Sequence, residues 1–464
     1  MTTEDIKKLL TRFRVNTESE IITTLIKSNQ PMLDRLYQNW LEYKGTVPIL
    51  SRTLEVGNEN KLNNKLAHDF RGLIVDQAVG YMFGNPIVYY AGSDGEQEVL
   101  DGFKEYVQLD DLDSQTATFA SACGYAVRML YIDQDGLESA MNVNPWECIF
   151  VLDGSTNQTQ YVLRFYDVEY YIDGKKTTKR KVEWYDKDVV TFYISVDDDK
   201  TVYVLDSTEP QNPLPHNFSY VPLVKFKNNE LEQGDFQKVA TIVDGYDELM
   251  SDVQNEIEEF RLAYMIFAGT EPSAEAIVAA RKTGAFGIDK EDRVEFLTKQ
   301  INDVFIENSK KTHEQNIFRF ARAVDMSDET FSGAGQTGES RKWKLVDLEN
   351  KCIQKERKFN HATKEQFKIL ASAWAKKNVK FDYTQVELEF KRNLPKDLEY
   401  EARTTTLLKG NVSEDTRLSL LSFIDNPQDE MAEMEAEGGM NFDKIPDTMP
   451  LTPEEMAKQQ MVNP

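Results

Sequence analysis

The sequence predicts an α+β fold in which helices and an antiparallel β region occupy separate parts of the chain. Apolar residues recur every three or four positions before about residue 84 and again after residue 235, which is helical spacing. Between about residues 125 and 205 the pattern changes to short alternating runs separated by turns, which is typical of paired strands. At 464 residues the chain is long enough for two or more substructures.

Two helices are predicted before the β region. The first begins near Thr17, carries apolar residues through Trp40 and ends before Gly45. The second extends from Leu66 to Phe83, where the following Gly-Asn-Pro sequence stops it. The β region then contains six predicted strands, at residues 127–132, 148–152, 161–166, 182–185, 189–195 and 201–205.

A long helix is predicted from Asp235 to Tyr264, with a length of about 45 Å at 1.5 Å per residue. One face is an apolar stripe, and the segment holds eight Asp or Glu against two Lys or Arg. So narrow a stripe indicates packing against equally long helices, and a self-contained bundle explains it equally well.

A small insert and a returning helix are predicted next. Ser273 can cap a short helix that stops at Gly284, and residues 285–289 and 294–298 form a predicted hairpin. The returning helix covers residues 303–324. Together the long helix, the insert and the returning helix lead the chain away from the main body and back to it.

A polar, glycine-rich loop at residues 325–340 precedes a third long helix, Arg341 to Asn378. This helix has eleven Lys or Arg against four Asp or Glu, although the chain has a net charge of -25. A strand at residues 379–391 and two short helices split near Gly410 follow. Beyond Asn426 we expect a chain that is disordered, or ordered only by a partner.

The glycine-rich loop resembles two nucleotide-binding patterns. Gly333-Ala-Gly335-Gln-Thr-Gly338 fits G-x-G-x-x-G, and Gly333 to Ser340 nearly fits the phosphate loop. However, Glu339 stands where the phosphate-binding lysine is required, and the loop follows a helix instead of a strand. We therefore interpret the glycines as a source of conformational freedom and keep a nucleotide-binding enzyme as an alternative.

Other kinds of site receive little support. The residues contain no nucleophile–histidine constellation and no histidine pair at metal-ligand spacing, so we expect no catalytic residue, no metal and no cofactor. The three cysteines, Cys123, Cys148 and Cys352, are too scattered for a disulfide framework. No apolar run reaches membrane-spanning length, and the first residues do not form a secretory signal. The net charge also opposes tight binding of DNA phosphates.

The order of elements resembles the portal proteins of tailed bacteriophages, particularly those of siphoviruses of Gram-positive bacteria. The local resemblance lies in the run from Asn63 to Pro86, in Val143-Asn-Pro-Trp-Glu147, in Phe331-Ser-Gly-Ala, and in Lys342-Trp-Lys-Leu with Leu348-Glu349. It covers roughly residues 1 to 435 and depends on the combination of these segments.

The resemblance implies a portal architecture with named parts. These are an N-terminal helical arm at 1–60, a wing at 61–234, stem helices at 235–264 and 303–324, a small α/β clip at 265–302, a tunnel loop at 325–340, a long basic helix with a wing strand at 341–394, a helical crown at 395–436 and a disordered tail at 437–464.

The implied function is a non-enzymatic head–tail connector, a ring of twelve copies at one capsid vertex through which double-stranded DNA is packaged, retained and ejected. The implied partners are other copies of the chain, the large terminase subunit, the head–tail connector or adaptor protein, and the scaffolding and major capsid proteins, with no membrane. The implied location is the virion, after assembly in the host cytoplasm. A monomeric helical scaffold or adaptor protein remains the other alternative.

The implied DNA-contact residues belong to the tunnel loop. They are Phe331, Ser332, Gly333, Gly335, Gln336, Thr337 and Gly338, with Arg341, Lys342 and Lys344 near enough to influence the electrostatic field. We hypothesise that the acidic helix faces repel phosphates, so that the duplex slides instead of adhering.

Overall fold

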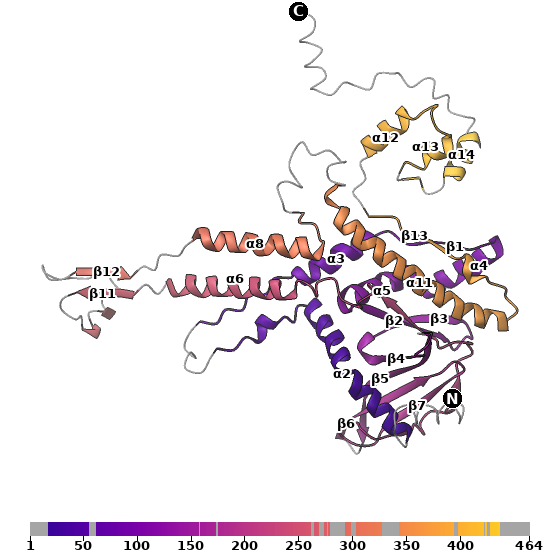
Figure 1. The fold of residues 1–464 in the computed structure, drawn as a ribbon, viewed down its shortest axis with the longest axis horizontal. Helices are drawn as coiled ribbons and strands as arrows, with labels where there is room; N and C mark the ends of the chain where they lie inside the picture. Colours follow the sequence, from indigo (N-terminus) through magenta and orange to yellow (C-terminus); the bar gives the residue numbers. More distant parts are fainter. Residues whose placement is uncertain are drawn as a thin grey trace, which may run out of the picture. The chain divides into compact units, whose positions relative to one another are not determined.

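The computed structural model describes residues 17–54, 62–156, 158–172, 175–260, 264–268, 273–275, 277–278, 293–297, 303–326, 343–393, 398–421, 423–424 and 427–436. The fold is α+β, as predicted, with helices and antiparallel sheets (Figure 1). The chain divides into two compact units, Met1–Asn393 and Leu394–Pro464, which are described separately.

The first unit begins with helix α2 (Glu18–Tyr43), whose N-terminus is capped by the Thr17 hydroxyl. A short 3-10 helix, η1 (Pro48–Ser51), and helix α3 (Phe70–Phe83) follow. Helix α3 therefore begins four residues after the predicted start at Leu66, because residues 62–69 have no regular secondary structure. Asp69 caps it by accepting the Gly72 amide.

Two helices that the sequence did not predict precede the β region. They are α4 (Asp94–Val107) and α5 (Leu109–Cys123), joined at Gln108, and strand β1 (Val88–Tyr90) lies before them. Gly124 ends α5 with a φ of +111°, a conformation that favours glycine. A Cβ atom on Gly124 would lie 2.2 Å from the Glu232 carbonyl oxygen, so this turn also needs glycine for close packing.

Two antiparallel sheets make up the β region. The first has the order β10-β2-β3, with β2 (Tyr125–Ile132), β3 (Glu138–Val143) and β10 (Leu223–Lys227). The second has the order β4-β5-β6-β7-β8, with β9 paired to β7; its strands are β4 (Cys148–Leu152), β5 (Thr159–Ile172), β6 (Lys175–Tyr185), β7 (Val189–Ser195), β8 (Tyr203–Leu205) and β9 (Leu214–Pro215). All six predicted strands are confirmed, while β3, β9 and β10 were not predicted.

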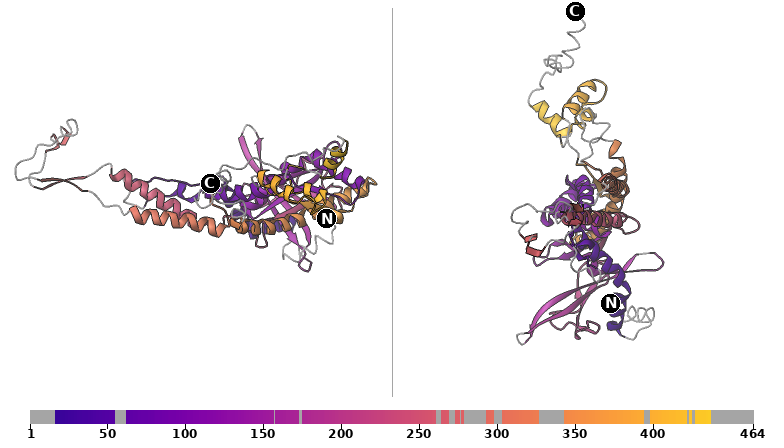
Figure 2. Two further views of the ribbon diagram at one scale, coloured as in Figure 1. Left: turned by 90° about the horizontal axis from the view of Figure 1, so that it is seen from above. Right: turned by 90° about the vertical axis from the view of Figure 1, so that its left-hand side faces the viewer.

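Helices α6 (Ala240–Phe260) and α8 (Asp303–Ala321) lie side by side in Figures 1 and 2. The predicted helix from Asp235 was too long, because α6 has 21 residues and the positions before Ala240 form turns. Tyr264 begins a strand, β11 (Tyr264–Ala268), instead of ending the helix.

The second strand of the predicted hairpin, residues 294–298, corresponds to a described strand. Strand β12 (Arg293–Leu297) pairs with β11, with Tyr264 opposite Leu297 and Ala268 opposite Arg293. Residues 285–289, the predicted partner, lie outside the described residues, as does most of the predicted helix that ends at Gly284. Strand pairing is set by contacts between distant residues, which local periodicity does not contain.

Helix α11 (Val346–Lys376) is the third long helix of the prediction. After the 3-10 helix η3 (Tyr383–Gln385), strand β13 (Glu387–Glu389) pairs antiparallel with β1. The predicted strand at residues 379–391 is thus reduced to three residues.

Three clusters of buried apolar side chains hold the first unit together. One joins α2, α3, α5, β2, α6 and α8, and a second joins α4, β2, β10 and α11. The third packs α2 against the larger sheet, with Ile22, Leu163 and Val182 fully buried. The roots of α6 and α8 therefore belong to the same core as the β region.

The second unit contains the helices α12 (Leu398–Leu407), α13 (Glu414–Leu418) and α14 (Pro427–Ala436). The predicted division near Gly410 is confirmed, since this residue has a φ of +80° between α12 and α13. The expectation of disorder directly beyond Asn426 was wrong, because α14 is helical. Residues 437–464 lie outside the described residues.

Candidate functional site

Most of the predicted DNA-contact residues lie outside the described part of the chain. These are Phe331, Ser332, Gly333, Gly335, Gln336, Thr337, Gly338, Arg341 and Lys342. Lys344 is described and is half-buried just before α11. The structure therefore defines the two ends between which the glycine-rich loop is held.

The first end of the loop follows α8 and is fixed by Gln77 of α3. The Gln77 side-chain amide donates to the Val324 carbonyl, and its oxygen accepts the Val324 amide, both at 2.7 Å. Lys351 of α11 donates to the Ala321 carbonyl at 3.1 Å, which satisfies a backbone acceptor at the C-terminus of α8. This end is therefore bound to both α3 and α11.

The second end of the loop leads into α11, whose first turns are held by Arg392. The Arg392 guanidinium contacts Glu349 at 2.9 Å and Glu356 at 2.8 Å, and the Tyr81 hydroxyl donates to Glu349 at 2.7 Å. Trp343, just before this helix, is 72% exposed. The start of α11 is thus attached to α3 and to the segment that follows β13.

A buried ion pair joins α11 to the segment before α6. The Lys355 ammonium lies 2.5 Å from the Asp235 carboxylate and 2.5 Å from the Ser121 hydroxyl. The Asn228 side chain donates to the same carboxylate. Burial raises the pKa of Asp235, but the Lys355 and Lys351 ammonium groups outweigh it and hold the pKa below its usual value.

The basic character of α11 is used largely to hold this helix to the body. Besides Lys351 and Lys355, Lys358 pairs with Glu230 and Lys377 pairs with Glu138 at 2.8 Å. Lys376 donates to the Asn217 carbonyl, and Lys368 lies over the Tyr220 ring. These cations have partners in their own chain, and none of them is one of the residues predicted to influence the field at the loop, which are Arg341, Lys342 and Lys344.

Helices α6 and α8 run antiparallel and are joined by polar contacts near their roots. The Tyr246 hydroxyl donates to Glu314 at 2.8 Å. At the neighbouring level, a Cβ on Gly245 would lie 3.5 Å from the His313 ring. The buried residues Val243 and Ile317 belong to the common core.

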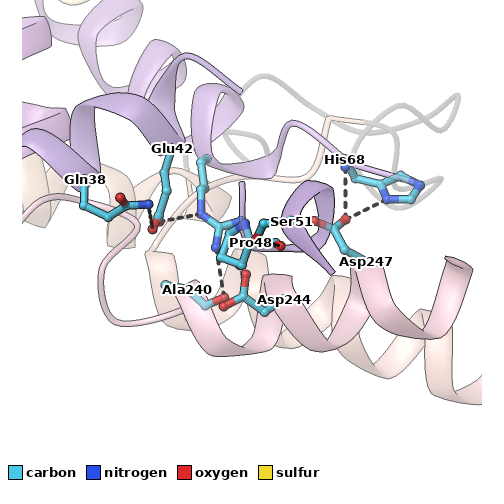
Figure 3. Close-up of polar contacts among 9 residues, drawn as sticks. Gln38, Glu42, Pro48, Ser51, His68, Ala240, Asp244 and Asp247 are labelled. Carbon is cyan, nitrogen blue, oxygen red and sulfur yellow. Dashed lines mark hydrogen bonds and ion pairs between the residues drawn. The ribbon is translucent and has the colours of Figure 1, made fainter. Parts of the chain in front are cut away.

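A fully buried guanidinium fixes the root of α6. Arg71 of α3 contacts Glu42 of α2 at 3.0 Å and Asp244 of α6 at 2.7 Å, and Figure 3 shows the two carboxylates approaching from different elements. Nothing in the sequence prediction marked this residue. The available signal was a single cation in a mostly apolar helical run, since a buried cation requires paired anions.

Next to this group, His68 faces Asp247 in Figure 3. The Asp247 carboxylate accepts a hydrogen bond from the His68 backbone amide at 3.0 Å. The same carboxylate oxygen lies 2.8 Å from the His68 Nδ1 atom. Burial raises the pKa of the Asp247 carboxyl, and the contacts from His68 oppose that shift.

Residues 62–68, which we call the strap, lie along α6 and are bound to it by three hydrogen bonds from their backbone amides. The amides of Asn64, Leu66 and His68 donate to the side chains of Asn255, Ser251 and Asp247, respectively. Alternate residues of the strap thus meet every fourth residue of the helix. Two extended residues span about 6.6 Å and four helical residues about 6.0 Å, so the two spacings nearly match.

Arg52, which precedes the strap in the sequence, also binds α6. Its guanidinium contacts Asp252 at 2.9 Å, the Asn63 side chain at 3.0 Å and the Asn64 carbonyl at 3.0 Å. Asp244, Asp247 and Asp252 of α6 therefore have partners in their own chain. The acidic face that we predicted for this helix is correspondingly smaller.

The described residues contain no group of three or more His, Cys, Asp or Glu arranged to hold a metal ion. Cys123, Cys148 and Cys352 are buried free thiols, and burial raises the pKa of each. Among the described helices, none combines the length and hydropathy needed to cross a membrane.

A family model described as phage portal protein, SPP1 Gp6-like, matches residues 23–443. The chain belongs to this portal family. A portal protein of Bacillus phage SPP1 is 25% identical over 399 residues, which cover 82% of this chain and 77% of that protein. A portal protein of Clostridium phage phiCD119 is 28% identical over 282 residues, which cover 55% of this chain and 60% of that protein.

The resemblance inferred from the sequence is thereby confirmed, including its direction toward phages of Gram-positive bacteria. The chain is a phage portal subunit, a structural component of the virion and not an enzyme. A role in a ring that passes phage DNA follows from membership of the portal family. The nucleotide-binding enzyme considered as an alternative is set aside on the same ground.

Proposed function

We propose that twelve copies of this portal subunit form the ring. Residues 235–264 and 303–324, which contain α6 and α8, are its stem, and residues 265–302 are its clip. The wing corresponds to residues 61–234, and the N-terminal arm to residues 1–60. In this scheme residues 341–394 supply the long helix and wing strand, residues 395–436 supply the crown, and residues 437–464 form the tail.

The observation that carries the proposal is the attachment of both loop ends to one frame. Gln77 and Lys351 hold the end of α8, while Arg392 holds the start of α11. Lys355 joins α11 to the segment that leads into α6. A loop between such fixed ends can change conformation while the surrounding channel wall keeps its shape, which suits a duplex that must slide.

The tunnel loop at residues 325–340 is the proposed DNA-contact element. Gln336 and Thr337 make brief polar contacts, and Arg341, Lys342 and Lys344 shape the local field. Such contacts are weak and exchangeable, because tight phosphate binding would oppose translocation. The packaging energy comes from the large terminase subunit, and the clip faces first this motor and later the head–tail connector. Scaffolding and major capsid proteins surround the ring during assembly in the host cytoplasm.

The first experiment is mass measurement with negative-stain imaging of the purified full-length protein. Rings with a central hole and a mass of about twelve subunits support the proposal. Particles at 53.4 kDa, the mass of one chain, contradict the ring and favour the monomeric scaffold or adaptor.

A second experiment tests the loop. Lys342→Glu reverses one charge beside the tunnel loop, so we expect altered DNA packaging or retention with ring assembly unchanged. Packaged DNA length and DNA retention are measured in phage particles carrying the variant, with Lys27→Glu, the same change of charge at an exposed position of α2, as a control. Normal packaging and retention in Lys342→Glu would contradict the assigned role.

A further inference from the structure

A row of carboxylates lies along α6 at intervals of four residues, at Asp244, Glu248, Asp252 and Glu256. Residues at this spacing are neighbours on a helix surface, where like charges destabilise the helix. Asp244 is paired with Arg71, and Asp252 is paired with Arg52. Glu248 is exposed between them, and no cation of the described residues forms an ion pair with it.

An exposed row on α8 carries both signs of charge. At four-residue intervals it contains Asp303, Glu307, Lys311, Gln315 and Arg319, and all five are exposed. Among the residues that the structure describes, no carboxylate forms an ion pair with Lys311. Glu248 on α6 and Lys311 on α8 are therefore exposed groups of opposite charge, each without an ion-pair partner among the described residues.

Glu248 and Lys311 lie at the same height along the antiparallel pair. The bond between Tyr246 and Glu314 and the proximity of Gly245 to His313 fix the register of the two helices. Continuing this register places residue 248 opposite residue 311. The two side chains nevertheless stay exposed and form no ion pair with each other, because neither occupies the face where α6 packs on α8.

We propose that Glu248 of one copy pairs with Lys311 of the adjacent copy in the ring. The inference rests on the proposed function, in which α6 and α8 form the stem. In a stem whose helices run along the ring axis, rotation about that axis leaves heights unchanged, so two groups at one height on the helix pair can meet across the boundary between copies. Each boundary is heterologous, with an α6 face on one side and an α8 face on the other.

The pair acts on assembly and not on the fold of one copy. Exposed ion pairs contribute little individually, and reversal of one partner replaces attraction by repulsion. Charge reversal at one partner therefore weakens association roughly three- to tenfold at each boundary at low ionic strength. At high salt the effect disappears, because exposed charges are screened beyond about 3 Å at 1 M.

The test uses the full-length single variants Glu248→Lys and Lys311→Glu, the double variant, and an equal mixture of the two single variants. Native mass spectrometry at low salt measures the protein concentration at which rings form. Each single variant should need a higher concentration, and the double variant should return to the wild-type value.

The mixture distinguishes pairing between copies from pairing within a copy. In a ring where the two single variants alternate, one boundary brings the two substituted side chains together, lysine against glutamate, and the next boundary keeps the native pair. The mixture should therefore assemble like the wild type. If the double variant assembles normally and the mixture does not, the two residues meet within one chain and the inference is wrong. Equal assembly of all variants also contradicts it.

Two controls keep the result clear. Glu98→Lys makes the same change of charge on the exposed surface of α4 and should leave ring formation unchanged. Thermal unfolding of the single variants should match the wild type, since both positions are exposed. A wild-type protein that forms no rings would contradict the proposed function itself, whereas failed complementation with normal wild-type rings contradicts only this pairing.

Discussion

Buried cations join elements that are distant in the sequence. Arg128 of β2 contacts Asp113 of α5 and Gln366 of α11, both at 2.9 Å, and its guanidinium lies over the Phe226 ring. The Tyr89 hydroxyl donates to Asp113 at 2.5 Å. Burial raises the pKa of Asp113, whereas Arg128 and Tyr89 oppose the shift. Arg71 and Lys355 have the same function at other junctions.

The pair of Lys355 and Asp235 gives a residue-scale prediction for stability. Lys355→Met leaves a buried carboxylate without its nearest cation, so the free energy of unfolding should fall by about 3–5 kcal/mol. The double variant Lys355→Met with Asp235→Leu should recover most of this loss, because two apolar side chains can replace a buried ion pair. Chemical denaturation followed by tryptophan fluorescence measures both. A double variant no more stable than the single one would contradict the explanation.

The same pair predicts a dependence on pH. The pKa of Asp235 is lower in the folded protein than its usual value, so its ionised form stabilises the fold. This contribution is complete above the unfolded pKa of about 3.9 and is lost as the pH falls through the lower, folded pKa. Wild-type protein should therefore exceed Asp235→Asn in stability at pH 7, and the difference should narrow below about pH 4. Denaturation midpoints at pH 7 and pH 3 test this, and a constant difference would exclude the mechanism.

The sequence shows which residues are charged but not which groups they pair with. The sequence shows eleven Lys or Arg between Arg341 and Asn378, and the structure shows that Lys351, Lys355 and Lys377 bind the body. A residue count cannot distinguish a cation that faces solvent from one that enters a junction. The partner of Lys355, Asp235, lies 120 residues away, and no local pattern connects them.

At the scale of elements, the strap shows how an extended segment can be bound by a helix. Its amides need acceptors, and α6 supplies the Asp247, Ser251 and Asn255 side chains every fourth residue. No neighbouring strand is involved in these contacts. The arrangement explains why α3 begins only at Phe70, since the residues before it donate their amides to α6.

Removing two of these acceptors should release the strap. Ser251→Ala with Asn255→Ala eliminates the acceptors for Leu66 and Asn64, and each lost hydrogen bond costs about 1 kcal/mol. Hydrogen exchange of residues 64–66 should accelerate while the core of α6 remains protected. Gln254→Ala is the matched control on the same helix, because Gln254 contacts only Glu258 in the contacts described. Unchanged exchange in the double variant would show that other contacts hold the strap.

Elements with a clear local period were predictable, and elements without one were not. The six predicted strands are short runs rich in β-branched and aromatic residues, some alternating in polarity and one, Cys148–Leu152, apolar throughout. Helix α5 was missed because its buried face consists largely of small or polar residues such as Thr116, Ala117, Ala120 and Ser121. Their helical spacing gives only a weak apolar signal.

For the whole molecule, the core lies within the first unit. All three apolar clusters draw their buried residues from positions before Asn393, and Arg392 completes the attachment of α11. The division into two units was anticipated only as a boundary near residue 395 between the wing strand and the crown. Membership of the portal family was predictable because its evidence is spread over most of the chain.

A chain that ends at Asn393 should therefore fold. We expect its thermal midpoint, followed by circular dichroism at β-sheet and helix wavelengths, to match the main transition of the full-length protein. A chain that ends at Gln385 is the comparison, since it lacks β13 and Arg392 and should be less stable. Failure of the longer truncation to fold would mean that the second unit contributes to the core.

The fixed ends of the glycine-rich loop also set a contour length. Eighteen residues separate Val324 and Trp343. A chain spans at most about 3.5 Å per residue, so these residues measure about 60 Å when fully extended. Eighteen residues held at both ends can therefore reach at most about 30 Å from those ends. Insertions or deletions between the Gln77 and Lys351 contacts on one side and the Arg392 contacts on the other would change this radius without altering any anchor.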